Sequence, residues 1–188
     1  MSVDSVAISA DTLMVCLSHA LSTETEEIMG LLLGDVVKTP NGEGSQARIW
    51  SVSLHRRETA ARSDDRVEIN PEQLAAAAQE AERLSGELGV YTRVVGWYHS
   101  HPHLAVVPSH VDVGTQAMYQ QMDSGFVGLI FSVFNQGRVI PGVPTGTQVA
   151  NENGILETSM GKIDNVGRIQ LTAFQSRYKN SDGGTVPA

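Results

Sequence analysis

Apolar runs of strand length alternate along this chain with segments whose apolar residues recur at helical spacing, and this alternation limits the fold more than any other feature. Helical spacing predicts three helices, over residues 10–21, 70–89 and 109–122. Apolar runs and strict alternation predict five strands, over residues 26–37, 48–55, 92–99, 125–134 and 167–176. The order of these elements indicates a mixed fold of α-helices and β-strands.

The segment NPEQLAAAAQEAERLSGELG carries the clearest helix signals. Asn70 can cap the helix and Pro71 suits its first position. Either Gly86 or Gly89 can end it, because glycine readily adopts the left-handed conformation found after helices. We therefore expect a helix with well-defined ends.

Length and composition describe an ordinary globular chain. Its 188 residues suffice for one domain, and no apolar run approaches the about 20 residues of a membrane helix. The opening MSVDSVAISADTLMV lacks the pattern of a secretory signal, and a net charge of −8 argues against a general nucleic-acid surface. The single cysteine, Cys16, suits a reducing compartment, and we expect it to fill the core.

The second half of the chain is less regular. Residues 135–166 carry Gly, Pro, Asn and Thr with weak periodicity, which predicts a mobile surface excursion. The ending SDGGTVPA has the composition of a linker. We expect one domain over residues 1–178, followed over residues 179–188 by a polar tail or the start of a linker.

Two histidines stand at the end of the strand predicted over residues 92–99. Residues two apart on a strand face the same side, so His99 and His101 can present both imidazoles to one point while Ser100 faces away. Pro102 cannot donate to a sheet ladder and should free this end from pairing. The pair can bind a metal, or it can be a pair of half-buried hydrogen-bonding groups at a strand end.

A carboxylate follows in the first turn of the helix predicted over residues 109–122. Asp112 could join the two imidazoles as a third ligand, and three protein ligands with one open position are typical of catalytic zinc. Ser109-x-x-Asp112 also has the spacing of a capping box, and the two roles need not exclude each other. On this helix we also expect Val111, Met118 and Met122 to be buried.

Other titratable residues have weaker signals. His103 and His110 are expected at the rim of such a site or behind its ligands, because Pro102 interrupts the strand period. Glu27 adjoins the apolar run IMGLLLG, where a carboxylate is costly to bury without a partner or a role. It can be a general base or a solvated corner residue, and the sequence leaves both open.

Taken together, Glu27-Ile-Met-Gly, His99-Ser-His101-Pro and Ser109-x-x-Asp112 resemble the signature of the JAMM, or MPN-plus, metalloprotease family. Segments such as EEIMGLLLG, RVVGWYHSHPH and GFVGLIFS are most similar to the BRCC-type branch, the catalytic subunits of BRISC and BRCA-A deubiquitinase complexes. The resemblance covers roughly residues 10 to 134. It implies an α/β fold of the α+β type, with a curved, mostly antiparallel sheet flanked by helices, similar to cytidine deaminases.

The resemblance also implies a site. His99, His101 and Asp112 would bind one Zn²⁺, Glu27 would act as general base and then acid, and Ser109 would donate to the developing oxyanion. The implied activity is hydrolysis of lysine-63-linked polyubiquitin in ubiquitin signalling and the DNA damage response. Departures from the family pattern are Val107, where a tryptophan is expected, and the sequence of residues 135–166.

Partners and location are implied in the same way. Members of this branch pair with a catalytically inactive MPN protein of the Abraxas or Abro type, in part through C-terminal helices that lie beyond this sequence. A homodimer is the alternative without that partner, no direct nucleic-acid or membrane contact is expected, and the location would be cytoplasmic and nuclear. Competing hypotheses are a non-catalytic MPN scaffold and a hydrolase of another amide or of a cysteine conjugate.

Overall fold

A computed structural model describes residues 3–39, 42, 44–55, 69–135, 155–159, 163–166, 169–179 and 185–187. Three helices accompany the sheet in this part of the chain: α1 (Ala10–Ala20), α2 (Pro71–Leu88) and α3 (His110–Met122). The strands of the main sheet are β1 (Ser5–Ser9), β2 (Met29–Lys38), β3 (Ser45–His55), β4 (Arg93–Pro102), β5 (Val127–Val133), β6 (Ile155–Ser159), β7 (Ile163–Val166) and β8 (Ile169–Phe174). A separate pair consists of β9 (Arg177–Lys179) and β10 (Thr185–Pro187).

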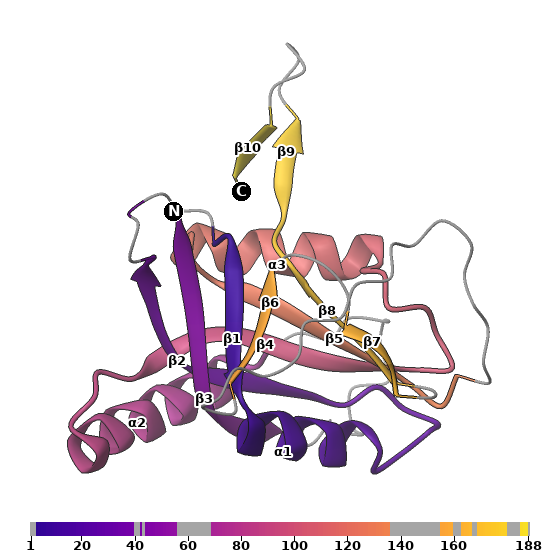
Figure 1. Cartoon of the computed structure of the whole chain (residues 1–188), viewed down its shortest axis with the longest axis horizontal. Coiled ribbons are helices and arrows are strands. Elements are labelled where there is room, and N and C mark those ends of the chain that lie inside the picture. The colour runs from indigo at the N-terminus through magenta and orange to yellow at the C-terminus, as the bar shows by residue number, and fades with distance from the viewer. Residues whose placement is uncertain are drawn as a thin grey trace.

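The main sheet has the strand order β6-β1-β3-β2-β4-β5-β8-β7 (Figure 1). β1 runs parallel to β3 and β4 runs parallel to β5, while every other neighbouring pair is antiparallel. This confirms the predicted α/β class with a mostly antiparallel sheet. The five predicted strands correspond to β2, β3, β4, β5 and β8.

The helix ends follow from local chemistry. At the start of α2 the Asn70 side chain accepts from the Glu72 N–H, and Gln73 accepts from the Asn70 N–H in return. Gly89 ends this helix with a φ of 65°, a conformation that costs glycine little. Gly89, one of the two glycines predicted to end the helix, is therefore its C-cap, and Gly86 lies within the helix.

Two apolar clusters cover the two faces of the sheet. One includes Cys16 and Ala20 of α1, both fully buried, which confirms that Cys16 is a core residue. The other includes Ala77 of α2 and Tyr119 of α3. Successive residues of β4 enter opposite clusters, with Trp97 in the second, so this strand presents one set of side chains to α2 and α3.

The predicted inner face of α3 is wrong. Val111, Met118 and Met122 are exposed, at 38%, 47% and 64%. Polar residues occupy the inner face instead, because they bond to buried groups: Gln116 Oε1 accepts from Trp97 Nε1 at 2.8 Å, and Gln116 Nε2 donates to a main-chain carbonyl at 2.7 Å. A buried polar group is tolerated when it is hydrogen-bonded in this way.

The predicted surface excursion also needs correction. Within residues 135–166, β6 pairs antiparallel with β1 and β7 pairs with β8, so both outer edges of the sheet come from this stretch. Edge strands are held by main-chain hydrogen bonds, which a weak side-chain pattern does not reveal. The predicted mobility concerns mainly residues 136–154 and 160–162, which lie outside the described residues.

The positions of β6 and β7 require the sheet to curve. Seven inter-strand steps of about 4.8 Å would separate them by about 34 Å in a flat sheet. The chain from Ser159 to Ile163 has four residue steps and spans at most about 14 Å. The end of β6 at Ser159 and the start of β7 at Ile163 therefore lie close together.

In the chain's last segment, β9 pairs with β10 where a polar tail was expected. Across the described ranges, no helix is both long and apolar enough to cross a bilayer.

Candidate metal centre

The end of β4 brings two imidazoles together. His99 and His101 are 0% and 5% exposed, and their Nε2 atoms lie 3.0 Å apart on the same side of the strand. On the β2 side the ladder ends at the pair of His99 with Met29, whereas on the β5 side pairing continues as far as Pro102. The prediction that Pro102 frees this end from the sheet is thus wrong for the β5 side.

The first turn of α3 brings a carboxylate to the same point. Ser109 caps the helix, since its Oγ accepts from the Asp112 N–H at 3.2 Å and its own N–H donates to Asp112 Oδ2 at 2.6 Å. The Asp112 oxygens lie 3.3 Å from His99 Nε2 and 3.5 Å from His101 Nε2. The predicted capping box is present, and the same carboxylate faces both imidazoles.

The spacing of these three groups suits a metal ion. Metal distances of about 2.0–2.2 Å in a tetrahedral zinc site place its nitrogen and oxygen ligands about 3.3 Å apart, close to the 3.0, 3.3 and 3.5 Å found here. In the described part of the chain this is the one group of three or more His, Cys, Asp or Glu side chains arranged to hold an ion. The buried group His99, His101 and Asp112 could therefore bind a metal.

The surroundings fix the orientation of both imidazoles. His101 Nδ1 lies 2.7 Å from the Ala105 carbonyl oxygen, to which it can donate, leaving the Nε2 lone pair for a metal. The His99 ring stacks on Trp97, with 4.7 Å between ring centroids and 14° between planes. Within the described ranges no group bonds to His99 Nδ1, so packing against Trp97 holds this ring.

The charges in this site support one another. Burial opposes ionisation of Asp112, but hydrogen bonds from His101 and His99 outweigh it and hold the pKa of Asp112 well below its usual range. Burial likewise opposes protonation of His101, but its hydrogen bond to Asp112, the Ala105 carbonyl and the charge of Glu27 together raise its pKa. The site therefore contains an ionised carboxylate and favours positive charge.

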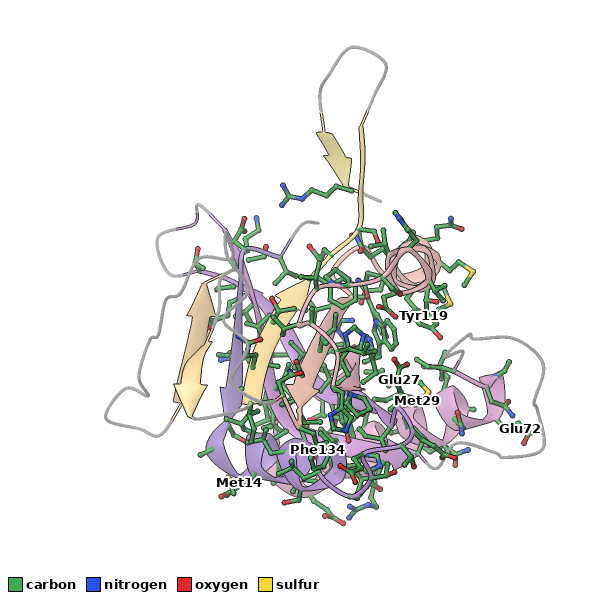
Figure 2. The ribbon with its side chains drawn as sticks, turned by 90° about the vertical axis from the view of Figure 1, so that its right-hand side faces the viewer. Met14, Glu27, Met29, Glu72, Tyr119 and Phe134 are labelled. Atoms are coloured by element: carbon green, nitrogen blue, oxygen red, sulfur yellow. The ribbon has the colours of Figure 1, made fainter. Side chains whose placement is uncertain are left out.

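Glu27 approaches the site from the segment before β2. Its side chain is half-buried and lies beside Met29, facing the space below Tyr119 of α3 (Figure 2). Its charge acts on His101. Glu27 was predicted as a candidate base, and its charge lies close enough to His101 to raise the pKa of that imidazole.

Three further histidines lie apart from the three converging groups. His103 is exposed, forms an ion pair of 3.5 Å with Glu24, and packs its ring against Phe134. His110 is exposed at the first position of α3. His19, on the other side of the sheet, has its Nδ1 2.9 Å from the Tyr98 hydroxyl.

Sequence reasoning missed two residues that support the site. Trp97 stacks on His99, and Gln116 accepts the hydrogen bond that fixes the Trp97 indole. The strand period offered a signal for Trp97, because it precedes His99 by two positions and so shares its side of β4. For Gln116 no comparable signal exists, since its partner comes from another element.

Comparisons with known proteins add to this geometry. Residues 1–125 match the family described as JAB1/Mov34/MPN/PAD-1 ubiquitin protease. The chain is similar to the Lys-63-specific deubiquitinase BRCC36 of Xenopus tropicalis, with 56% identity over 134 residues, 71% of this chain and 49% of that protein. It is also similar to BRCC36 of Rattus norvegicus, with 52% identity over 149 residues, 70% of this chain and 51% of that protein.

The extent of these matches matters for interpretation. The chain spans about half the length of the curated relatives it matches. Among solved structures, the solution structure of protein DSY2949 from Desulfitobacterium hafniense gives a TM-score of 0.47 at 20% identity, covering 68% of this chain and 74% of that chain. That likeness is too slight to support an argument.

Proposed function

Because the chain belongs to the JAB1/Mov34/MPN/PAD-1 ubiquitin protease family, we propose that it is a zinc-dependent isopeptidase that hydrolyses lysine-63-linked polyubiquitin. The observation that carries the proposal is the convergence of His99, His101 and Asp112 on one buried point. The linkage is inferred from the relatives, which are named Lys-63-specific deubiquitinases. A scaffold protein would have no need of a complete, buried ligand set.

Zinc is the metal that this donor set favours. Two imidazoles and one carboxylate at tetrahedral spacing are typical of zinc hydrolases, in which three protein ligands leave one position open. When bound, the ion supplies a Lewis acid and lowers the pKa of a coordinated water to about 7. His99, His101 and Asp112 would hold it, and their framework of capping, stacking and main-chain bonds orients them in advance.

Glu27 is the proposed general base. It is not one of the three converging groups, and its charge lies close enough to His101 to raise the pKa of that imidazole. A carboxylate there can accept a proton from the attacking water and deliver it to the leaving lysine amine. This role requires that Glu27 be free of metal coordination.

Ser109 is the proposed oxyanion donor. Its Oγ accepts from the Asp112 N–H, and a hydroxyl group that accepts a hydrogen bond still has its own proton to donate. Because Ser109 is exposed at the start of α3, that proton can reach the carbonyl oxygen of a bound substrate. Removing one such donor typically costs about 3 kcal/mol of transition-state stabilisation.

The assembly is also a proposal. By similarity we infer that the chain works with a catalytically inactive MPN subunit of the Abraxas or Abro type and that a homodimer forms without it. A cytoplasmic and nuclear location follows from the same inference. Fractionation of cells that express the tagged protein would test the location, and pull-down with the candidate subunit would test the pairing.

Cleavage of a panel of defined diubiquitin linkages tests the function. The protein is assayed with zinc, alone and together with the inactive MPN subunit. We expect lysine-63 diubiquitin to be cleaved in preference to other linkages. Cleavage of none, with or without the subunit, would favour a scaffold, and cleavage of a different amide substrate alone would favour another hydrolase.

Two variants separate the roles of ligand and base. Glu27→Gln should retain one zinc per chain while turnover is lost, because an amide cannot take up the proton. His99→Ala should lose both zinc and turnover. Zinc content is measured by atomic emission on dialysed protein. A Glu27→Gln protein that cleaves at the original rate removes Glu27 from the mechanism.

A further inference from the structure

The ladder between β2 and β4 continues by one unusual pair beyond its last regular residues. The Ser100 N–H donates to the Ile28 carbonyl oxygen at 3.0 Å, as in an ordinary antiparallel pair. In return, the Ile28 N–H donates at 2.9 Å to Ser100 Oγ, a side-chain atom where a regular ladder would use a main-chain carbonyl. Ser100 is fully buried, so water does not compete for this bond.

This bond acts on the main chain next to the proposed base. The Ile28 nitrogen belongs to the peptide group that joins Glu27 to Ile28, so the Ser100 hydroxyl fixes that peptide directly. The Ile28 side chain belongs to the cluster on the α1 face, while Met29 belongs to the cluster on the face of α2 and α3. Alternation then directs Glu27 to the face that carries His99 and His101. Figure 2 shows Glu27 beside Met29, which belongs to the cluster on this face.

The segment before Ile28 offers Glu27 little other support. Residues 21–26 form turns and bends and are mostly exposed, and β2 begins only at Met29. A side chain in such a segment needs an anchor if its carboxylate is to stay within proton-transfer distance of a substrate water. In the described part of the chain, the bonds between Ser100 and Ile28 are the main-chain anchor next to Glu27.

We propose that Ser100 is a positioning residue, whose hydroxyl holds the Glu27–Ile28 peptide so that Glu27 faces the metal centre. This inference rests on the proposed function. Neighbouring residues on a strand face opposite sides, and the Ser100 hydroxyl bonds to Ile28, so it can be removed without removing a ligand atom. Ser100 would thus position Glu27, whereas His99 and His101 would bind the metal.

The test compares Ser100→Ala with Ser100→Thr and with a matched control. Ser85 makes an equivalent bond at the opposite end of β4, where its Oγ accepts from the Thr92 N–H at 2.8 Å. Ser85→Ala therefore removes a similar hydroxyl far from the histidines. Each variant is loaded with zinc and assayed on lysine-63 diubiquitin with the MPN subunit. Zinc affinity is measured by competition with a chelator, and amide hydrogen exchange at Ile28 by NMR.

We expect Ser100→Ala to lower kcat by about 10- to 100-fold with KM and zinc affinity unchanged, since small misplacements of a catalytic group have effects of this size. Exchange at Ile28 should become faster in the same variant. Ser100→Thr, which keeps a hydroxyl, should retain most of kcat and the slow exchange. Ser85→Ala should leave kcat unchanged.

The outcomes that overturn the proposal are distinct. Cleavage by the wild type together with an unchanged kcat in Ser100→Ala overturns the inference alone. An equal loss of kcat in Ser85→Ala, or a loss of zinc affinity in Ser100→Ala, assigns the effect to general stability or to the ligands and also overturns it. A wild-type protein that cleaves no linkage overturns the proposed function and this inference with it.

Discussion

Asp112 serves the start of α3 and the candidate metal centre with the same carboxylate. Its Oδ2 accepts from the Ser109 N–H, while its two oxygens face His99 and His101. The helix start needs an acceptor at this position, and the imidazoles need a negative charge. The two roles place different demands on the side chain, and a substitution can therefore separate them.

We predict that Asp112→Asn loses zinc but largely keeps the helix. The amide oxygen of asparagine can still accept from the Ser109 N–H, so the capping bond is kept. The free energy of unfolding of the metal-free protein should still fall, because the ionised Asp112 beside His99 and His101 stabilises the fold. Zinc affinity should fall by at least about 100-fold, since residues that only support ligands already account for 10- to 100-fold. Chelator competition and urea unfolding measure the two quantities.

Glu72→Gln provides the control for that prediction. Glu72 is another acid in the first turn of a helix, but it lies on α2 and is exposed. Its replacement should leave zinc affinity unchanged. Full zinc occupancy in Asp112→Asn would leave Asp112 with the capping role alone.

At the scale of elements, the pairing of β2 with β3 depends on a close approach at Gly34. The register shifts between Leu33 and Gly34, and a Cβ built at Gly34 would lie 1.8 Å from the Arg48 carbonyl oxygen. Beside this point Arg48 forms an ion pair with Asp35. No side chain fits between the two strands here unless the main chain moves.

We predict that Gly34→Ala destabilises the protein by about 1–3 kcal/mol or more, as overpacking of a rigid site does. Urea unfolding of the metal-free protein measures the change. Gly86→Ala is the control, because a Cβ there meets no atom within 4 Å in the interior of α2. It should stabilise the helix by about 0.5–1 kcal/mol. A destabilisation of similar size in both variants would contradict the argument from close approach.

The elements also show how far sequence reasoning extends. Helices α1, α2 and α3 and the strands that carry the site could be predicted because period, caps and turns are local signals. The orientation of α3 could not, because Gln116 and Gln120 face inward to bond partners from distant parts of the chain. The hydrogen bond between the Ile28 N–H and Ser100 Oγ could not be predicted for the same reason, because the two residues are 72 positions apart in the sequence.

Across the whole molecule, the two faces of the sheet have different chemistry. The α2 and α3 face carries the polar site, whereas the α1 face carries a neutral buried pair, Cys16 and Tyr98. Burial raises the pKa of the Cys16 thiol to about 12, from its ordinary value of 9.0. Burial also raises the pKa of the Tyr98 hydroxyl. The folded protein therefore disfavours the ionised form of each group, and ionisation of either one would destabilise it.

The raised pKa of Cys16 predicts a loss of stability at alkaline pH. The unfolded chain releases the thiol proton first, so the contribution is complete below about pH 9 and falls as the pH rises toward 12, by at most about 1.4 kcal/mol per pH unit. Urea unfolding between pH 8 and pH 10.5 measures the slope. Cys16→Ala should show a shallower slope than the wild type, because it removes the thiol and, with it, the contribution of Cys16 to the raised pKa of Tyr98. Identical slopes would contradict the prediction.

The curvature of the sheet affects how easily molecules of this protein can join edge to edge at high concentration. β6 and β7 end the sheet on opposite sides, yet only four residue steps separate Ser159 from Ile163, so the two border strands approach each other at these ends. A sheet that bends in this way has no long flat border. Exposed flat borders are the usual route to fibrils, and curvature discourages that route.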